Sequence, residues 1–363
     1  MRLLAIDIGG MTQDILLFDT SMVAENWVKM ILPSPTLATA QKIERSTRAG
    51  EKLFFSGANM GSGPNKRAVK KHLDAGLKVY ATPEAATTFD DDLDEVKGLG
   101  ITLVSEEEGQ RLSGVTRIET KDLDLATLYY ALKTLGVSTT FDALAIAVLD
   151  HGAAPPGTSD RLFRFQHLQE AIQRDNELAS LSHMKDEIPS YLTRMKAVAR
   201  SADADLPLLL MDTGAACALG ALEDPAVAEH ERRLVVNAGN FHTIAFNLRQ
   251  STILGIFEHH TGRLTIKKLD GFITRLLSGE LTNREVYDDG GHGCYIAGSD
   301  RDQPFFTITG PRRRIASGSI FQPHYAAPYG DMMLSGCFGL VRAFAHHIRE
   351  WREEIEKALY TGN

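Results

Sequence analysis

The sequence predicts an α/β protein made of two similar halves with a cleft between them. Two segments share one pattern, which is a short apolar strand, then Asp or Asn, a small residue and glycine, then a second apolar strand. These segments are 3–19, LLAIDIGGMTQDILLFD, and 233–248, RLVVNAGNFHTIAFNL. In this alignment Asp7 falls opposite Asn237, and Gly9 falls opposite Gly239. Each segment is typical of a β-hairpin with a tight glycine turn, so the pair predicts a duplicated domain.

Length and composition are those of a globular protein of two or three domains. The 363 residues are 43% hydrophobic and 24% charged, so each domain can bury a core. The formal net charge of −8 argues against a general nucleic-acid-binding protein. The longest apolar stretch, 206–222, is interrupted by Asp212 and is too short to cross a bilayer. The first residues, MRLLAIDIGG, do not resemble a signal peptide, so we expect a cytoplasmic protein without a membrane partner.

The cysteines exclude several kinds of chemistry. Cys217, Cys294 and Cys337 lie far apart, which indicates a reducing compartment and no disulfide framework. The chain has no CxxC and no CxxxCxxC motif, so a bound iron–sulfur cluster for radical chemistry is excluded. The motifs HExxH, GxxxxGK[ST], GxGxxG and GxSxG are also absent, which removes zincins, P-loop NTPases, simple Rossmann enzymes and α/β-hydrolases as first candidates.

The first glycine turn has the composition of a phosphate-binding turn. Backbone N–H groups of Gly9, Gly10, Met11 and Thr12 can point into one concavity, because glycine lets the backbone approach a ligand closely. Asp7 ends the strand beside the turn and could hold Mg²⁺. A hairpin that needs glycine only for its turn is the alternative, and the second copy of the pattern favours the phosphate interpretation.

Two further segments complete the pattern. Residues 206–222 read as a buried strand that becomes a small-residue helix at Asp212, a natural N-cap. Residues 332–359 read as a strand, a turn from Gly336 to Gly339, and a long helix. Glycines in that turn would let the backbone lie flat against a base or ribose, and a plain strand–turn–helix unit is the alternative.

The order hairpin, small-residue helix, hairpin, strand–GxxG–helix resembles the superfamily of actin, sugar kinases and heat-shock chaperone ATPases (ASKHA). The matching segments are Asp7–Asp14, Asp212–Leu222, Asn237–Thr243 and Leu334–Val341. The resemblance implies two duplicated ribonuclease H-like domains, each with a mixed five-stranded sheet and helices, around a nucleotide cleft. More narrowly, the chain resembles an uncharacterised family of archaeal and bacterial proteins often labelled pyruvate formate-lyase activating-like, a label that the missing CxxxCxxC motif contradicts.

This resemblance, together with the strand patterns, predicts the domain boundaries. They are residues 1–32 plus 124–225 for the first domain, 33–123 for an α/β insertion, 226–345 for the second domain, and 346–363 for a C-terminal helix that packs back across. We expect the insertion to contain strands near 52–57 and 78–83 and a glycine-rich loop at 57–67 that feeds a helix. With Lys66 and Arg67 beside it, this loop could hold an anion or could simply begin a helix.

The resemblance also implies roles for individual residues. Asp7 would bear Mg²⁺, and Asp212 would be the catalytic base, with an N-cap carboxylate as the equal alternative. Asp150 is the second choice for a base or metal ligand, with a solvated loop aspartate as the favoured alternative. The phosphates of ATP would contact both turns, and the adenosine would contact the last segment. The predicted nucleotide contacts are Gly9, Gly10, Met11, Thr12, Asn237, Gly239, Asn240, Thr243, Gly336 and Gly339.

Other charged and histidine clusters are interpreted as ordinary structure. Residues 90–92 read as a solvated acidic run, and 312–314 as an exposed basic run. The loop 288–294 reads as a turn, because no second His or Cys stands at zinc-ligand spacing. The pairs 259–260 and 346–347 read as surface or packing histidines.

Two functions remain open from the sequence. The first is an Mg-ATP-dependent phosphotransferase or ATPase with an unidentified small acceptor, for which the 57–67 loop suggests an anion. The second is a non-catalytic nucleotide- or ligand-binding regulatory protein that keeps the fold. Asn237 favours the second, because asparagine cannot supply a carboxylate to a metal or act as a base.

Overall fold

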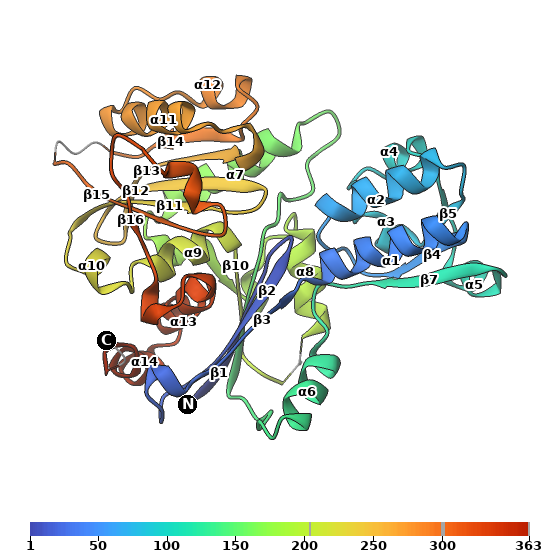
Figure 1. Ribbon diagram of the computed structural model, residues 1–363, viewed down its shortest axis with the longest axis horizontal. Helices are drawn as coiled ribbons and strands as arrows, with labels where there is room; N and C mark the ends of the chain where they lie inside the picture. The colour runs from blue at the N-terminus through green and yellow to red at the C-terminus, as the bar shows by residue number, and fades with distance from the viewer. Residues whose placement is uncertain (203–204, 299–301, 362–363) are drawn as a thin grey trace.

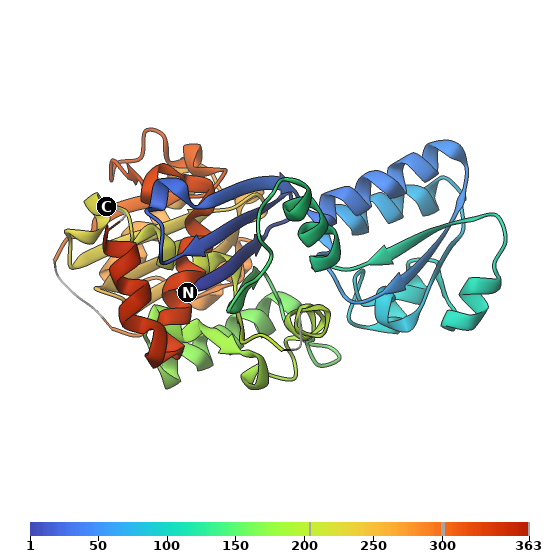
Figure 2. The same ribbon diagram turned by 90° about the horizontal axis from the view of Figure 1, so that it is seen from below.

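The computed structural model describes residues 1–202, 205–298 and 302–361. The predicted domains also include residues that lie outside the described ones, namely 203–204, 299–301 and 362–363. Two six-stranded sheets make up one part of the molecule, and a four-stranded sheet with its helices stands to one side of them (Figures 1 and 2). In the described part of the chain, no helix has the length and apolar character needed to cross a membrane.

The first sheet has the strand order β3-β2-β1-β8-β10-β9. Its strands are β1 (Arg2–Ile8), β2 (Thr12–Asp19), β3 (Val28–Pro33), β8 (Ala143–Val148), β9 (Ser182–Met184) and β10 (Leu208–Met211). The pairs β1–β2 and β2–β3 are antiparallel, whereas β1–β8 and β8–β10 are parallel. Strand β8 is buried along its whole length, which explains its unbroken run of apolar residues.

The second sheet repeats this arrangement in the order β14-β13-β12-β11-β15-β16. Its strands are β11 (Arg232–Ala238), β12 (His242–Arg249), β13 (Thr252–His260), β14 (Gly293–Ile296), β15 (Phe305–Thr309) and β16 (His324–Tyr325). Again the first three strands in chain order pair antiparallel, and β15 and β16 continue in parallel on the other side of β11. The predicted duplication of a five-stranded mixed sheet is therefore confirmed, and each sheet adds one edge strand, β9 or β14.

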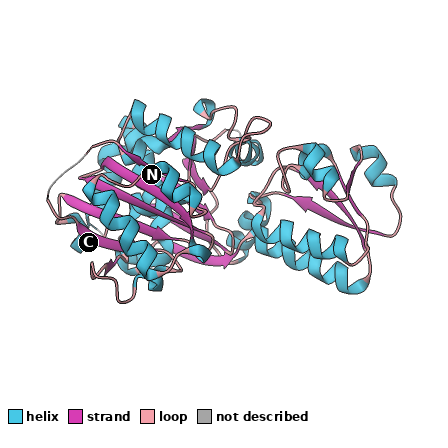
Figure 3. Ribbon diagram, turned by 90° about the horizontal axis from the view of Figure 1, so that it is seen from above, coloured by secondary structure: helices cyan, strands magenta, loops and turns pink. Residues whose placement is uncertain are grey.

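The insertion is a parallel sheet with the order β6-β5-β4-β7. Its strands are β4 (Lys52–Gly57), β5 (Val79–Ala81), β6 (Ile101–Leu103) and β7 (Val115–Thr120), and its helices are α1 (Pro35–Ala49), α2 (Gly63–Asp74), α3 (Pro83–Ala86), α4 (Leu93–Gly98) and α5 (Glu106–Arg111). A hydrophobic core drawn only from residues between Ala40 and Ile118 holds these elements together. Figure 3 shows this α/β unit as a separate body joined to the two larger sheets.

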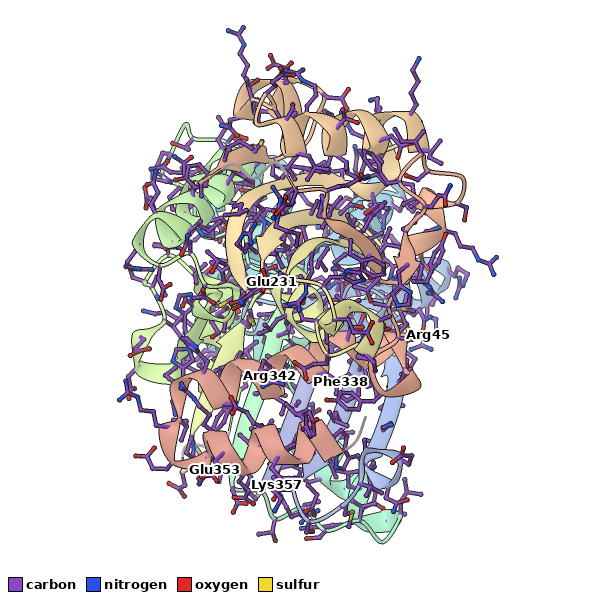
Figure 4. The ribbon with its side chains drawn as sticks, turned by 90° about the vertical axis from the view of Figure 1, so that its left-hand side faces the viewer. Arg45, Glu231, Phe338, Arg342, Glu353 and Lys357 are labelled. Carbon is purple, nitrogen blue, oxygen red and sulfur yellow. The ribbon has the colours of Figure 1, made fainter. Side chains whose placement is uncertain are left out.

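The remaining helices surround and join the two large sheets. They are α6 (Leu125–Thr134), α7 (Asp160–Arg174), α8 (Thr193–Ser201), α9 (Thr213–Ala221), α10 (Pro225–Ala228), α11 (Ile266–Ser278), α12 (Asn283–Asp288), α13 (Ser335–His347) and α14 (Arg349–Thr361). One hydrophobic core contains residues of both sheets together with α9 and α13. The chain leaves α13 at Ile348 and runs back beside it as α14; Figure 4 labels Phe338 and Arg342 on α13 and Glu353 and Lys357 on α14.

The helices α9 and α13 cross at very close range. A Cβ atom on Gly220 would lie 1.8 Å from the carbonyl oxygen of Ser335, and one on Gly339 would lie 1.8 Å from that of Ala216. The prediction of a strand and then a Gly336-to-Gly339 turn is wrong, because α13 already begins at Ser335 and both glycines lie inside it. Gly220 and Gly339 let the backbones of α9 and α13 touch, so these two glycines serve helix packing.

Candidate functional site

A cavity of about 420 Å³ lies where the two domains and the insertion meet. This volume is within the range typical of small-molecule sites. Its walls include the two hairpin turns, the start of α9, the loop before α2, and the segments that follow β8 and β15. All three parts of the molecule contribute, so a ligand in this cavity would contact each of them.

The two hairpin turns are closed by the same backbone hydrogen bond. The Gly9 N–H donates to the carbonyl oxygen of Thr12 at 2.9 Å, and the Gly239 N–H donates to that of His242 at 2.8 Å. Both turns line the cavity, and a Cβ atom on Gly10 would lie 2.3 Å from the ring of Phe241. The two turns therefore face each other across one cavity, as the sequence repeat predicted.

Most of the predicted contact residues lie at this cavity. Those that line it are Asp7, Gly9, Gly10, Thr12, Asp212, Asn237, Gly239 and Asn240. The buried side-chain oxygen of Asn237 has no hydrogen-bond partner among the described residues. The structure thus brings together the residues of three of the four sequence segments.

Four predicted contact residues do not line the cavity. Met11 lies at the turn but outside the lining, Gly339 lies in the crossing of α9 and α13, and Gly336 lies on α13 against Asp7. Thr243 is fully buried and its hydroxyl pairs with that of Thr261 at 2.9 Å. His242, rather than Thr243, occupies the position that Thr12 has in the first hairpin. Because side chains alternate along a strand, Thr243 points to the opposite face.

Asp7 and Asp14 form a carboxylate pair beside the first turn. They are opposite residues of β1 and β2, and both line the cavity. Each keeps one buried oxygen without a hydrogen-bond partner among the described residues. Burial raises the pKa of Asp7 to about 7, and burial together with the charge of Asp7 raises the pKa of Asp14 to about 8. Two unsatisfied carboxylate oxygens at a cavity wall fit a Mg²⁺ ion.

Gly336 has a part in forming this carboxylate pair. A Cβ atom at that position would lie 2.1 Å from Oδ2 of Asp7. The same oxygen accepts a hydrogen bond from the Cys217 thiol at 3.5 Å. Helix α13 therefore covers Asp7 closely, and the glycine leaves the space that the carboxylate occupies.

Asp212 is both an N-cap and a member of a buried charge cluster. Its Oδ1 accepts the Gly214 N–H at 2.9 Å, which begins α9 as the sequence predicted. Its Oδ2 accepts a hydrogen bond from Arg164 Nη1 at 2.9 Å. Arg164 is fully buried and its Nε also donates to both carboxylate oxygens of Glu258, at 3.0 and 2.8 Å. One cation thus links carboxylates from both domains.

Asp150 lines the cavity and also joins two segments of the first domain. It is buried, and its two oxygens accept the backbone N–H groups of Gly152 and Met195, each at 2.9 Å. The expectation of a solvated loop aspartate is wrong, because this carboxylate ties the β8 end to the start of α8. Both oxygens are used in these bonds.

A histidine cluster lies at the same cavity, and sequence spacing missed it. His151 follows β8, His242 begins β12, and His292 precedes β14; one ring nitrogen of each lies within 4.8 Å of the other two. Burial lowers the pKa of His151 well below its usual range and that of His292 to about 2, so both rings are neutral. Three distant segments supply these rings, so no short motif could have revealed them.

Neighbouring histidines have packing roles, with one exception. His259 is buried and its Nε2 lies 3.0 Å from Asp289, as expected of a packing residue. The His260 ring, which was expected only to pack, stands against the cluster, with ring centroids 5.1 Å from His242 and 4.7 Å from His292. The 288–294 loop forms a turn as predicted, but it also carries His292 into the interior.

The insertion loop lines part of the cavity wall and carries charges of both signs. Lys66 lines the cavity, but its ammonium group pairs with Asp90 at 2.9 Å, and Arg67 lies over the Phe241 ring at 5.5 Å. Asp90 and Asp91 line the cavity, and Asp91 is exposed, so this end of the predicted solvated acidic run also forms part of the cavity wall. Paired charges make this wall less positive than the sequence suggested.

The duplicated sheets, the crossed helices between them and the cavity under two matching turns define a protein of the actin, sugar kinase and chaperone ATPase fold. Within that class, the chain belongs to the family described as "Putative pyruvate format-lyase activating enzyme (DUF1786)", whose model matches residues 60–315. All three cysteines are free and buried. A search of curated proteins found no match.

Solved structures with a similar arrangement have low identity to this chain. The EutJ ethanolamine utilization protein of Carboxydothermus hydrogenoformans is 11% identical, with a TM-score of 0.32, 94% of this chain and 89% of that chain covered. The ROK hexokinase of Thermus thermophilus is 11% identical, with a TM-score of 0.26, and the match covers 70% of this chain but only about half, 49%, of the hexokinase. A PPX-GPPA enzyme of Aquifex aeolicus is 12% identical, with a TM-score of 0.22 and coverages of 85% and 67%.

Proposed function

We propose that the cavity binds a magnesium–nucleotide complex, with ATP as the nucleotide, and that the protein transfers the terminal phosphoryl group to a small acceptor or to water. One observation carries the proposal: two turns closed by the same backbone hydrogen bond face each other across one cavity, beside a pair of unsatisfied carboxylates. Successive backbone N–H groups in such turns suit phosphate oxygens. The triphosphate would lie between the turns of Gly9 and Gly239.

Asp7 and Asp14 are the residues that would hold Mg²⁺. A bound magnesium ion neutralises negative charge on the phosphates, which is most of what phosphoryl transfer requires of its site. Asp14 was not among the residues that the sequence singled out for the metal. Its position opposite Asp7 on β2 gives the ion a second protein carboxylate.

Asp212 is the proposed base for an acceptor hydroxyl. It lines the cavity at the start of α9, and Arg164 fixes the orientation of its carboxylate. The acceptor would lie between Asp212 and the insertion loop, where residues from Asn59 to Lys66 line the cavity. Movement of the insertion toward the two sheets would exclude water from this space.

A non-catalytic nucleotide-binding protein is the second candidate, and the structure contains an observation in its favour. Both carboxylate oxygens of Asp212 already accept hydrogen bonds, from Gly214 and Arg164. Each bond occupies one lone pair of its oxygen, so fewer lone pairs remain for an acceptor hydroxyl. In addition, the position that corresponds to Asp7 in the second domain is Asn237, which carries no charge.

Thermal unfolding with and without Mg-ATP, followed by assays of phosphate release and transfer, separates the candidates. A ligand at 100 times its Kd should stabilise the protein by about 2.7 kcal/mol. Turnover that falls at least 100-fold in Asp212→Asn, with the thermal shift retained, supports catalysis. Stabilisation without turnover in the natural chain supports the binding protein, and no response to any nucleotide overturns both.

Asp224→Asn is the matched control for this experiment. Asp224 is also a buried N-cap aspartate, and its Oδ1 accepts the Ala226 N–H at 3.0 Å at the start of α10. It does not line the cavity. Asparagine is as good an N-cap as aspartate, so both variants should fold. An equal loss of turnover in the control would show that the loss in Asp212→Asn comes from a disturbed fold and not from a missing base.

A further inference from the structure

We propose that His151, His242 and His292 form a binding site for a divalent transition metal of the zinc class, with a fourth coordination position open to the cavity. This site is separate from the Asp7–Asp14 pair and does not depend on nucleotide binding. The ligand set consists of three imidazoles, which suit zinc and its neighbours, whereas magnesium prefers oxygen ligands.

The distances between the rings match such a site. Nε2 of His151 and Nε2 of His292 lie 3.3 Å apart. Two nitrogens bound to one tetrahedral zinc ion at 2.0–2.1 Å would be about 3.3–3.4 Å apart. A nitrogen of His242 lies within 4.8 Å of both, so a small ring movement closes the set.

A buried carboxylate orients the second imidazole. Nδ1 of His242 lies 2.7 Å from Oε1 of Glu258, which leaves Nε2 as the metal-binding atom. Arg164 holds Glu258 in place through two bonds from its Nε. A carboxylate bonded to the second nitrogen of a histidine is the usual support for a metal-binding imidazole.

His292 is the deepest of the three ligands. It is fully buried, and its Nδ1 has no hydrogen-bond partner among the described residues. Its backbone N–H donates to the carbonyl oxygen of Glu258 at 2.9 Å, which fixes the ring behind the cavity wall. His151 and His242 line the cavity itself, so a water or oxyanion from the cavity is the fourth ligand.

The three histidines come from both domains. His151 follows β8 in the first domain, whereas His242 begins β12 and His292 precedes β14 in the second. A metal ion bound to all three would tie the domains together at the cavity. We therefore expect the metal to raise the thermal stability of the whole chain, in addition to providing a Lewis acid at the cavity wall.

The test is metal titration of the full chain, purified without a histidine tag and treated with a chelator. The chain should bind one equivalent of Zn²⁺, and one equivalent of Co²⁺ should give the visible absorption of a tetrahedral cobalt site. The variants His151→Gln, His242→Gln and His292→Gln should each lower the Zn²⁺ affinity at least tenfold. Circular dichroism checks that each variant is folded. If His292→Gln does not fold, the test rests on His151→Gln, whose side chain lies at the cavity wall.

Two matched controls assign the site. His260→Gln changes a ring that contacts His242 and His292 but is not in the ligand set, so its Zn²⁺ affinity should stay within threefold. Asp14→Asn should also leave Zn²⁺ binding unchanged, which separates this site from the proposed magnesium site. The proposal is overturned if the natural chain binds no stoichiometric Zn²⁺, if folded ligand variants keep its affinity, or if a control loses as much affinity as they do.

Discussion

Asp7 and Asp14 stand directly opposite each other on β1 and β2, and each has a buried carboxylate oxygen without a partner among the described residues. Their negative charges repel, and burial disfavours both ionised forms. A bound divalent cation would offset both the repulsion between the two carboxylates and the free-energy cost of burying their charges. The pair therefore links the stability of the protein to pH, and the proposed magnesium site would link it to magnesium as well.

Without a divalent cation, stability should fall as the pH rises from about 4 to about 8. The pKa values of about 7 and 8 in the folded protein exceed the ordinary value of 3.8, so over this range the folded state keeps protons that the unfolded chain has lost. Added Mg²⁺ should raise the melting temperature more at pH 8.5 than at pH 6, because at pH 6 it must displace protons. Asp14→Asn should weaken this pH dependence; an equal magnesium effect at both pH values would contradict the prediction.

Arg164→Met should lower the free energy of unfolding by about 3–5 kcal/mol, because it leaves two buried carboxylates without their cation. Chemical denaturation measures this loss. Adding Glu258→Gln to the same chain should restore part of it, since glutamine carries no charge that needs a partner. If the double variant is as unstable as the sum of the single changes, the ion pair is not the cause.

Gly339→Ala should destabilise the protein by about 1–3 kcal/mol or more, because the new methyl group collides with the backbone of α9. The control is Gly271→Ala in α11, where a Cβ atom meets nothing within 4 Å. That change should raise stability by about 0.5–1 kcal/mol, since alanine favours a helix more than glycine does. Thermal or urea unfolding compares the two, and a similar sign for both would contradict the close helix crossing.

The features that the sequence determined are those set by local spacing. The repeated pattern around Asp7 and Asn237 predicted two matching hairpins, because a glycine turn between two apolar strands involves only neighbouring residues. The N-cap at Asp212 was predictable for the same reason, since its bond to the Gly214 N–H spans two residues. The duplicated sheet then followed from the repeat.

Tertiary structure alone decided which residues share the cavity. Gly336 and Gly339 read as a turn, but both lie in α13, where Gly339 packs on α9 and Gly336 packs on Asp7 of β1. The set of His151, His242 and His292 comes from three segments that only the folded sheets bring together. Burial also decides the charge state of Asp14, because a pKa depends on the atoms that surround the carboxyl group, and local sequence does not specify them.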